Sequence, residues 1–250
     1  MGVIYIGDRF TGKTSLALEL ANPKSKYVKV IDPLYENLKA LLDGEEGKGT
    51  DAHQSTYDRQ IEIEVILRGA KTKKIYTEWI DTPGEIWRAK WQQDNHSEWI
   101  KFVETARASE GVILIVPPYR EIVRPDAEPE KFVTEQQWIR RFDRWVEFFQ
   151  DECPNTKHIA LCLNKADLLQ GVDLKQEAQQ LAYHPQTPRL NWNERHNRIS
   201  KQFFRPVRSH IARLNQCNTG LAVKCFITSI HNRALLELPW IYLGTFLQSD

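Results

Sequence analysis

Residues 7–14 have the sequence GDRFTGKT, which fits the spacing G-x-x-x-x-G-K-T without a mismatch. An apolar run at 3–6 precedes this stretch, and a helix-favouring run at 15–20 follows it. The glycines allow the backbone to curl so that successive N–H groups point inward. The start of the following helix adds the positive end of its dipole. This strand–loop–helix context predicts a phosphate-binding loop for a nucleotide.

The residue types within this loop have separate expected tasks. Lys13 is expected to reach the β- and γ-phosphates of the nucleotide. The hydroxyl of Thr14 is expected to ligate Mg²⁺. The predicted contacts to the nucleotide are Gly7, Asp8, Arg9, Phe10, Thr11, Gly12, Lys13, Thr14 and Ser15.

Strand-like and helix-like runs alternate along the rest of the chain. The predicted strands after the first are residues 27–32 (strand or extended), 60–67, 74–80, 111–116, 158–163 and 221–227, and the longer predicted helices are 86–108, 135–150, 173–182 and 193–217. The strands 60–67 and 74–80 are separated by a short turn, which predicts a hairpin. We therefore expect an α/β domain with a mostly parallel six-stranded sheet, one antiparallel hairpin strand, and helices on both faces.

Three further polar segments follow predicted strands. They are Asp81-Thr82-Pro83-Gly84, Asn164-Lys165-Ala166-Asp167 and Thr228-Ser229. Ligands of parallel-rich sheets bind at the carboxyl ends of the strands. The three segments are therefore expected to converge with residues 7–14 at one edge of one sheet.

The order G-x-x-x-x-G-K-T, D-T-P-G, N-K-A-D and T-S resembles the small-GTPase pattern of the translation-factor-related class of P-loop GTPases. D-x-x-G alone is weakly specific, whereas the complete set in order, each at a strand end, is a strong signal. The resemblance implies a P-loop NTPase G domain over residues 1–250, with insertions around 117–137 and 183–205. It also implies a GTP-binding switch that hydrolyses GTP to GDP with Mg²⁺. The D-T-P-G-E junction and the tryptophan-rich segment after it are similar to bacterial double-GTPase-type proteins of conflict-type gene clusters.

The resemblance assigns guanine recognition to the later motifs. Asn164 and Asp167 would recognise guanine, and the stem of Lys165 would pack on the plane of the base. Ser229 would support the base through its backbone or hydroxyl. The neighbours Leu168 and Ile230 complete the expected base site.

The resemblance also assigns the metal and the γ-phosphate. Asp81 would hold Mg²⁺ through water, and the Gly84 N–H would sense the γ-phosphate. A threonine of the loop at 43–58 would complete the metal shell, with Thr56 as the first choice and Thr50 as the alternate. The expected catalytic set is Lys13, Thr56, Gly84 and Glu85.

This chain departs from the Ras-like pattern. Glu85 stands where many relatives carry a water-orienting glutamine, and its carboxylate would repel the γ-phosphate unless it were protonated or turned away. Arg9 occupies a loop position that a small residue often holds, and T-S-I matches the guanine-side motif only partly. We therefore expect slow hydrolysis without a partner. A nucleotide-locked scaffold without turnover, and an ATP-dependent P-loop kinase or ATPase, stay open as alternatives.

Composition limits the remaining function classes. The net charge of +1 does not imply general binding to nucleic acid or to anionic membranes. Four scattered cysteines without a C-x-x-C pair suggest reduced thiols in a cytoplasmic protein. The chain shows no signal peptide and no apolar run long enough to span a bilayer. A protein effector is expected at the switch regions. Trp87, Trp91 and Trp99 are candidates for that surface or for packing on the sheet, and the basic stretch at 195–213 is expected to be a solvated or paired face.

Overall fold

A computed structural model describes residues 2–8, 11–43, 57–81, 86–186, 190–217 and 220–247, with backbone alone at 41–43, 57–59, 70, 81 and 217. Seven strands of the described residues form one sheet in the order β2-β3-β4-β1-β5-β6-β7. Their bounds are β1 Gly2–Gly7, β2 Val28–Asp32, β3 Tyr57–Ile66, β4 Thr72–Asp81, β5 Ser109–Val116, β6 His158–Leu163 and β7 Ala222–Ile227. Strand β3 pairs antiparallel with both β2 and β4, and every other pairing is parallel.

The prediction of six strands was one too few. The additional strand is β2, a five-residue piece that pairs with β3 at the edge of the sheet. Its buried residues, Val28 and Val30, face the core while Lys29 between them is exposed. This alternation suffices for an edge strand because only one face has to be buried.

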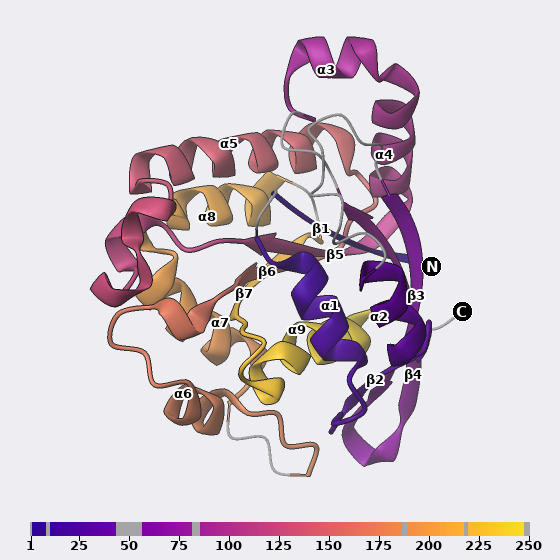
Figure 1. The fold of residues 1–250 in the computed structure, drawn as a ribbon, viewed down its shortest axis with the longest axis vertical. Helices are drawn as coiled ribbons and strands as arrows, with labels where there is room; N and C mark the ends of the chain where they lie inside the picture. Colours follow the sequence, from indigo (N-terminus) through magenta and orange to yellow (C-terminus); the bar gives the residue numbers. More distant parts are fainter. Residues whose placement is uncertain are drawn as a thin grey trace.

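Helices cover both faces of the sheet, as predicted (Figure 1). One face carries α1 Lys13–Ala21, α2 Tyr35–Asp43 and α9 Arg233–Phe246, and the other carries α4 His96–Ala108, α5 Glu135–Glu152 and α8 Arg208–Cys217. Helix α7 (Trp192–Phe203) packs against β7. Helix α6 spans Leu174–Leu181, and α3 (Ala89–Asp94) projects at the top of Figure 1.

Short 3₁₀ turns occur between the longer elements. They are η1 Arg68–Ala70, η2 Arg120–Ile122, η3 Pro125–Ala127, η4 Pro129–Lys131, η5 Ala166–Leu168 and η6 Arg205–Val207. Within the described residues, no helix has the length and apolar character needed to cross a membrane.

Two predicted helices are interrupted. The helix expected at 86–108 begins at Ala89 and breaks at Asn95, whose φ and ψ of −122° and 45° are not helical. The Asn95 N–H still bonds to the Trp91 carbonyl at 2.8 Å, so α3 ends there and α4 begins at once. The helix expected at 193–217, with an interruption or restart at Pro206, is divided there by η6 into α7 and α8, so this expectation is confirmed.

The tryptophans of the 86–108 segment pack inside the molecule. The ring of Trp87 meets that of Trp145 on α5 at 4.7 Å between centroids, and Trp99 lies 6.3 Å from Trp87. Phe102 and Phe148 complete this aromatic cluster. Trp91 is half-buried against the core. Trp87 and Trp99, both half-buried, therefore pack against aromatic side chains of α4 and α5.

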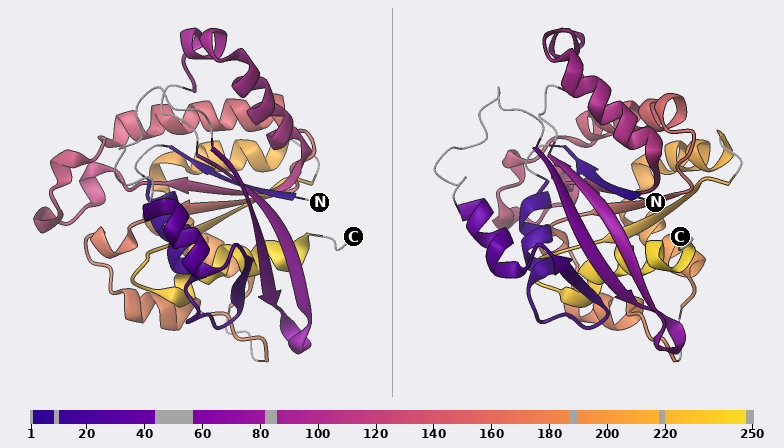
Figure 2. Two further views of the ribbon diagram at one scale, coloured as in Figure 1. Left: turned by 45° about the vertical axis from the view of Figure 1, so that its right-hand side comes forward. Right: turned by 90° about the vertical axis from the view of Figure 1, so that its right-hand side faces the viewer.

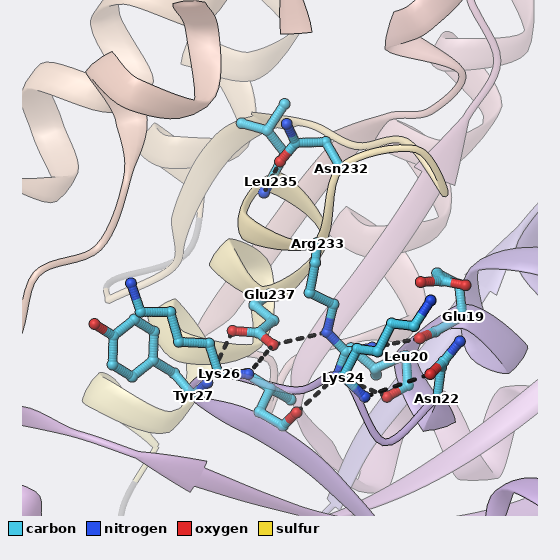
Figure 3. A network of polar contacts seen from close by, with 11 residues as sticks. Glu19, Leu20, Asn22, Lys24, Lys26, Tyr27, Asn232, Arg233, Leu235 and Glu237 are labelled. Carbon is cyan, nitrogen blue, oxygen red and sulfur yellow. Dashed lines mark hydrogen bonds and ion pairs between the residues drawn. The ribbon is translucent and has the colours of Figure 1, made fainter. Parts of the chain in front are cut away.

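A buried ion pair ties α9 to α1 and to the start of β2 (Figure 3). Glu237 is 1% exposed, and its carboxylate accepts hydrogen bonds from Arg233 Nε at 2.7 Å and from the N–H groups of Lys26 and Tyr27 at 3.0 Å. The other guanidinium nitrogens of Arg233 donate to the carbonyls of Glu19, Leu20 and Val28. The arginine thus donates to carbonyls in the last turn of α1, where intrahelical partners are fewer; that of Glu19 also accepts from the Asn22 N–H.

Side chains close part of the exposed edge of β7. The Val223 N–H donates to Asn215 Oδ1 on α8 at 2.8 Å, and the Cys225 N–H donates to His196 Nδ1 on α7 at 3.1 Å. Since Nδ1 must accept this bond, His196 is neutral in this arrangement. Burial, together with the nearby charges of Lys224 and Arg208, lowers the pKa of His196 to about 4.

The ion pair in Figure 3 predicts a large stability loss for Glu237→Gln. The change leaves the Arg233 charge buried without its counter-ion, and we expect a loss of about 3 kcal/mol in the free energy of unfolding. Urea denaturation measures this as a lower midpoint at unchanged slope. The matched control is Glu128→Gln, which removes the exposed partner of Lys131 and is expected to cost less than about 0.5 kcal/mol. Equal shifts of the urea midpoint in the two variants would contradict a stabilising role for the Arg233–Glu237 ion pair.

The neutral His196 predicts a pH-dependent stability. Its pKa is depressed in the folded state, so its contribution is complete above the unfolded value of about 6.5 and is lost as the pH falls toward 4. Thermal melts across this range should show a loss of about 1–3 kcal/mol. His196→Asn keeps an acceptor that does not titrate and should flatten this dependence. His96→Asn, at an exposed histidine, is the control. If His196→Asn kept the wild-type dependence of stability on pH, that dependence would not come from His196.

Candidate functional site

Both glycines of the phosphate loop are required by close neighbours. A Cβ on Gly7 would lie 2.2 Å from the carbonyl oxygen of Ile115 on β5. Gly12 has a φ of +86°, and a Cβ there would lie 2.7 Å from the side-chain nitrogen of Asn164. The loop therefore passes tightly between β5 and the segment after β6, and the left-handed turn at Gly12 starts α1.

Lys13 folds back over the loop. Its Nζ donates to the carbonyl of Gly7 at 2.7 Å and to that of Asp8 at 3.0 Å, and the residue is only 4% exposed. The Thr11 hydroxyl donates to the Asp8 carbonyl at 2.9 Å, and Tyr5 donates to the Lys13 carbonyl at 3.0 Å. These bonds hold a positive charge beside the N-terminus of α1, where the predicted phosphates would lie. Thr14 is half-buried and Ser15 is exposed on the same first turn.

Asn164 joins three of the predicted motifs. Its Nδ2 donates to the Thr11 carbonyl at 2.7 Å, and its Oδ1 accepts from the Thr228 hydroxyl at 3.2 Å. Asn164 is 3% exposed and Thr228 is 1% exposed, so both bonds are shielded from water. The convergence predicted from strand ends thus holds for residues 7–14, 164–167 and 228–229.

The segment after β6 presents Asp167 in a defined orientation. Lys165 adopts a left-handed conformation with a φ of 59° and precedes η5. Ser229 is fully buried, and its hydroxyl donates to Asp167 Oδ1 at 2.6 Å. The same hydroxyl accepts from the N–H of His231, whose Nε2 lies 4.0 Å from Asp167 Oδ2. Ser229 therefore positions the carboxylate of Asp167.

The segment at 117–137 braces this loop. The Arg124 N–H donates to the Leu168 carbonyl at 2.8 Å, and the Gln170 N–H donates to the Ile122 carbonyl at 2.9 Å. The ammonium of Lys165 lies 5.7 Å from the centroid of the Phe132 ring. A Cβ on Gly12 would lie 3.8 Å from Lys165 Cε, so the lysine stem runs from the phosphate loop toward Phe132. The sequence analysis named Thr228 within the converging T-S segment without giving it a separate task, and it missed Phe132 and His231. The position of His231 two residues after Ser229 was the available signal for that residue.

Several predicted site residues lie outside the described part of the chain. They are Arg9, Phe10, Thr50, Thr56, Gly84 and Glu85. Asp81 is described by its backbone alone, at the end of β4. Ile230, which follows Ser229, is 41% exposed, and Leu168, which follows Asp167, is half-buried.

The basic stretch at 195–213 is partly internal. Arg195 is 3% exposed and donates to the carbonyls of Leu181 and Ala182. Arg198 bonds to Glu177 at 3.0 Å, and His210 lies 2.7 Å from Asp143. Pairing thus accounts for part of this stretch, while Lys201, Arg205, Arg208 and Arg213 are exposed.

Comparisons with known proteins give low similarity throughout. No family model matches the chain. No curated protein matches it. Similar solved structures include two variants of the protein SsGBP, with 14% and 15% sequence identity and TM-scores of 0.47. The chain aligns over 98% of its own length with these but spans only 55% and 56% of theirs.

The G domain of the T. maritima FeoB iron transporter is another similar structure. It has 13% identity, a TM-score of 0.40, and coverage of 97% of this chain and 96% of its own. TM-scores below 0.5 at such identities establish neither a family nor an activity. The assignment of the site therefore depends on its own geometry: a glycine-bounded loop, a buried lysine and an oriented carboxylate at one edge of an α/β sheet.

Proposed function

We propose that this chain is a GTP-binding molecular switch that hydrolyses GTP to GDP with Mg²⁺, slowly without a partner. The observation that carries the proposal is the Asn164 amide between Thr11 and Thr228. It brings the phosphate loop, the N-K-A-D segment and the T-S segment to one place. A chance match to any one motif would not require this convergence.

Guanine selectivity follows from the orientation of Asp167. Ser229 holds Oδ1, which leaves the carboxylate directed by a fixed bond rather than by solvent. Guanine offers an N1–H and an exocyclic amine as two adjacent donors, whereas adenine lacks this pair. A bound adenine would not supply these two donors to the carboxylate, at a cost of about 1–3 kcal/mol.

The phosphates and the metal would share the start of α1. Lys13 would exchange its bonds to the loop carbonyls for the β- and γ-phosphate oxygens. Thr14 and Asp81, with Thr56 from the first switch, supply the oxygen donors that Mg²⁺ prefers. Among the described residues no group of three or more His, Cys, Asp or Glu side chains could hold a metal ion. Bound Mg²⁺ would neutralise charge on the phosphates.

The switch itself would be the ordering of residues 43–58 and 81–92 by the γ-phosphate, with a protein effector binding there. Slow turnover is proposed because Glu85 replaces a neutral glutamine of the Ras-like pattern. A nucleotide-locked scaffold differs only in the rate of turnover, which the first experiment below measures.

That experiment is binding of fluorescent GTP and ATP analogues to the purified chain, with and without Mg²⁺. We expect binding of the GTP analogue at least tenfold tighter than that of the ATP analogue, and weaker binding after chelation of Mg²⁺. Single-turnover phosphate release on the same sample should be slow. Equal or adenine-preferring binding would refute the guanine assignment, and no release at all would favour the locked scaffold.

Asp167→Asn should exchange the preferred base. An amide in place of the carboxylate presents a donor, so it should lose GTP and gain xanthosine triphosphate by competition binding. The change should cost about tenfold or more in GTP affinity. Asp126→Asn, at an acid that is 73% exposed in the 117–137 segment, is the matched control. Loss of both nucleotides in Asp167→Asn with a normal melting temperature would count against base recognition by this residue.

A further inference from the structure

The side chain of Lys165 lies between the phosphate loop and the segment at 117–134. A Cβ on Gly12 would lie 3.8 Å from Lys165 Cε, and Lys165 Nζ lies 5.7 Å from the centroid of the Phe132 ring. An ammonium within about 6 Å of a ring centroid is attracted to the face of the ring. The outer half of the half-buried lysine is therefore placed by Gly12 on one side and by Phe132 on the other.

The ring of Phe132 has an ordered support. Its N–H donates to the Pro129 carbonyl at 3.0 Å, which closes η4. The next residue, Val133, accepts from the Arg120 N–H at 2.8 Å. Thr134 then forms the capping box that begins α5. Phe132 thus stands between a 3₁₀ turn and a capped helix, and its ring is half-buried.

The segment at 117–134 is joined to the loop that bears Lys165. Val123 and Leu169 form an antiparallel bridge and are 4% and 1% exposed, and two backbone hydrogen bonds flank this bridge. From the side of β7, the Ala166 N–H donates to the Thr228 carbonyl at 3.0 Å. Figure 2 shows the segment on the side of the molecule away from the β3–β4 hairpin. Backbone contacts therefore hold Phe132 and Lys165 in place relative to each other.

Lys165 lies on the path of the nucleotide that the site is proposed to bind. The phosphates would lie beside Gly12 and Lys13, and the edge of the base would face Asp167. A long lysine side chain has much rotamer freedom, and it would lose that freedom if a base packed on its stem. An ammonium that Phe132 already holds has less of this freedom left to lose.

We propose that Phe132 is a positioning residue for the nucleotide base: it holds the Lys165 ammonium so that the lysine stem presents an apolar surface to the plane of the base. This inference deepens the proposed function and rests on it. Asp167 is proposed to recognise the edge of guanine, whereas every base has a plane. Phe132 should therefore strengthen the binding of purine nucleotides in general and leave the preference for guanine unchanged.

The test compares Phe132→Leu and Phe132→Tyr with the wild-type chain. Affinity is measured for the magnesium complexes of fluorescent GTP and ATP analogues and of inorganic tripolyphosphate, which has no base. Phe132→Leu should weaken both nucleotides by the same factor, about two- to fivefold, and leave tripolyphosphate unchanged. Phe132→Tyr keeps the ring face and should bind like the wild type. Phe246→Leu, at a phenylalanine that is 45% exposed near the end of α9, is the matched control.

A double-mutant cycle with Lys165→Met tests whether Phe132 acts through the ammonium. Methionine keeps an apolar stem without the charge, so Phe132→Leu should cost no further nucleotide affinity in this background. The same loss in the Lys165→Met background, an equal loss of tripolyphosphate binding, or unchanged nucleotide affinity in Phe132→Leu would overturn the proposal.

The same measurements separate this proposal from the proposed function. Equal affinity of the wild type for the GTP and ATP analogues, with the Phe132 effect intact for both, would refute guanine selection and leave the role of Phe132 standing. A clear guanine preference that Phe132→Leu leaves at wild-type affinity would refute the role of Phe132 alone.

Discussion

One buried amide, that of Asn164, holds the candidate site together. The side-chain amide donates to the Thr11 carbonyl before α1 and accepts from the Thr228 hydroxyl after β7. The backbone N–H of Asn164 donates to the Val116 carbonyl at the end of β5. Removal of the amide would leave a carbonyl and a hydroxyl buried without partners, each at about 1–3 kcal/mol. The same nitrogen would lie only 2.7 Å from a Cβ on residue 12, which is too close for any residue but glycine. Gly12 and Asn164 are therefore a coupled pair: the glycine makes room for the asparagine that positions it.

Helix α1 is fixed at both ends by residues distant in sequence. Its start is held through Thr11 by Asn164, and its last carbonyls are held by Arg233. Arg233 lies only four residues after Ser229, at the beginning of α9. The segment that supports the base site is thus continuous with the helix that holds the far end of α1. The base side and the phosphate side of the site are parts of one packed unit.

The sequence predicted those parts of the fold that depend on local pattern. The strands ending at Gly7, Leu163 and Ile227 follow from apolar runs, and the convergence of their polar segments follows from the parallel sheet. What it did not predict depends on tertiary contact. The break at Asn95 has no glycine or proline to mark it. Strand β2 was expected as a strand or an extended piece, and its place in the sheet depends on its pairing with β3.

The same distinction applies within the site. The tasks predicted for Lys13 and Asp167 rest on motif spacing alone and stay predictions. The contact between Phe132 and Lys165 joins residues 33 positions apart through a segment with little regular structure, and no pattern announces it. The switch threonine stays a prediction, since Thr50 and Thr56 fall outside the described residues.

The capped edge of β7 has a consequence for the solubility of the protein. A sheet edge with open N–H groups is a template on which another chain can add a strand. Asn215 and His196 occupy two alternate amides of β7, so a foreign strand would first have to displace them. Asn215 does not ionise, but His196 gives up its acceptor nitrogen once it takes a proton. Acidification would therefore expose this edge from the Cys225 end and make strand exchange between molecules, and with it aggregation, begin there.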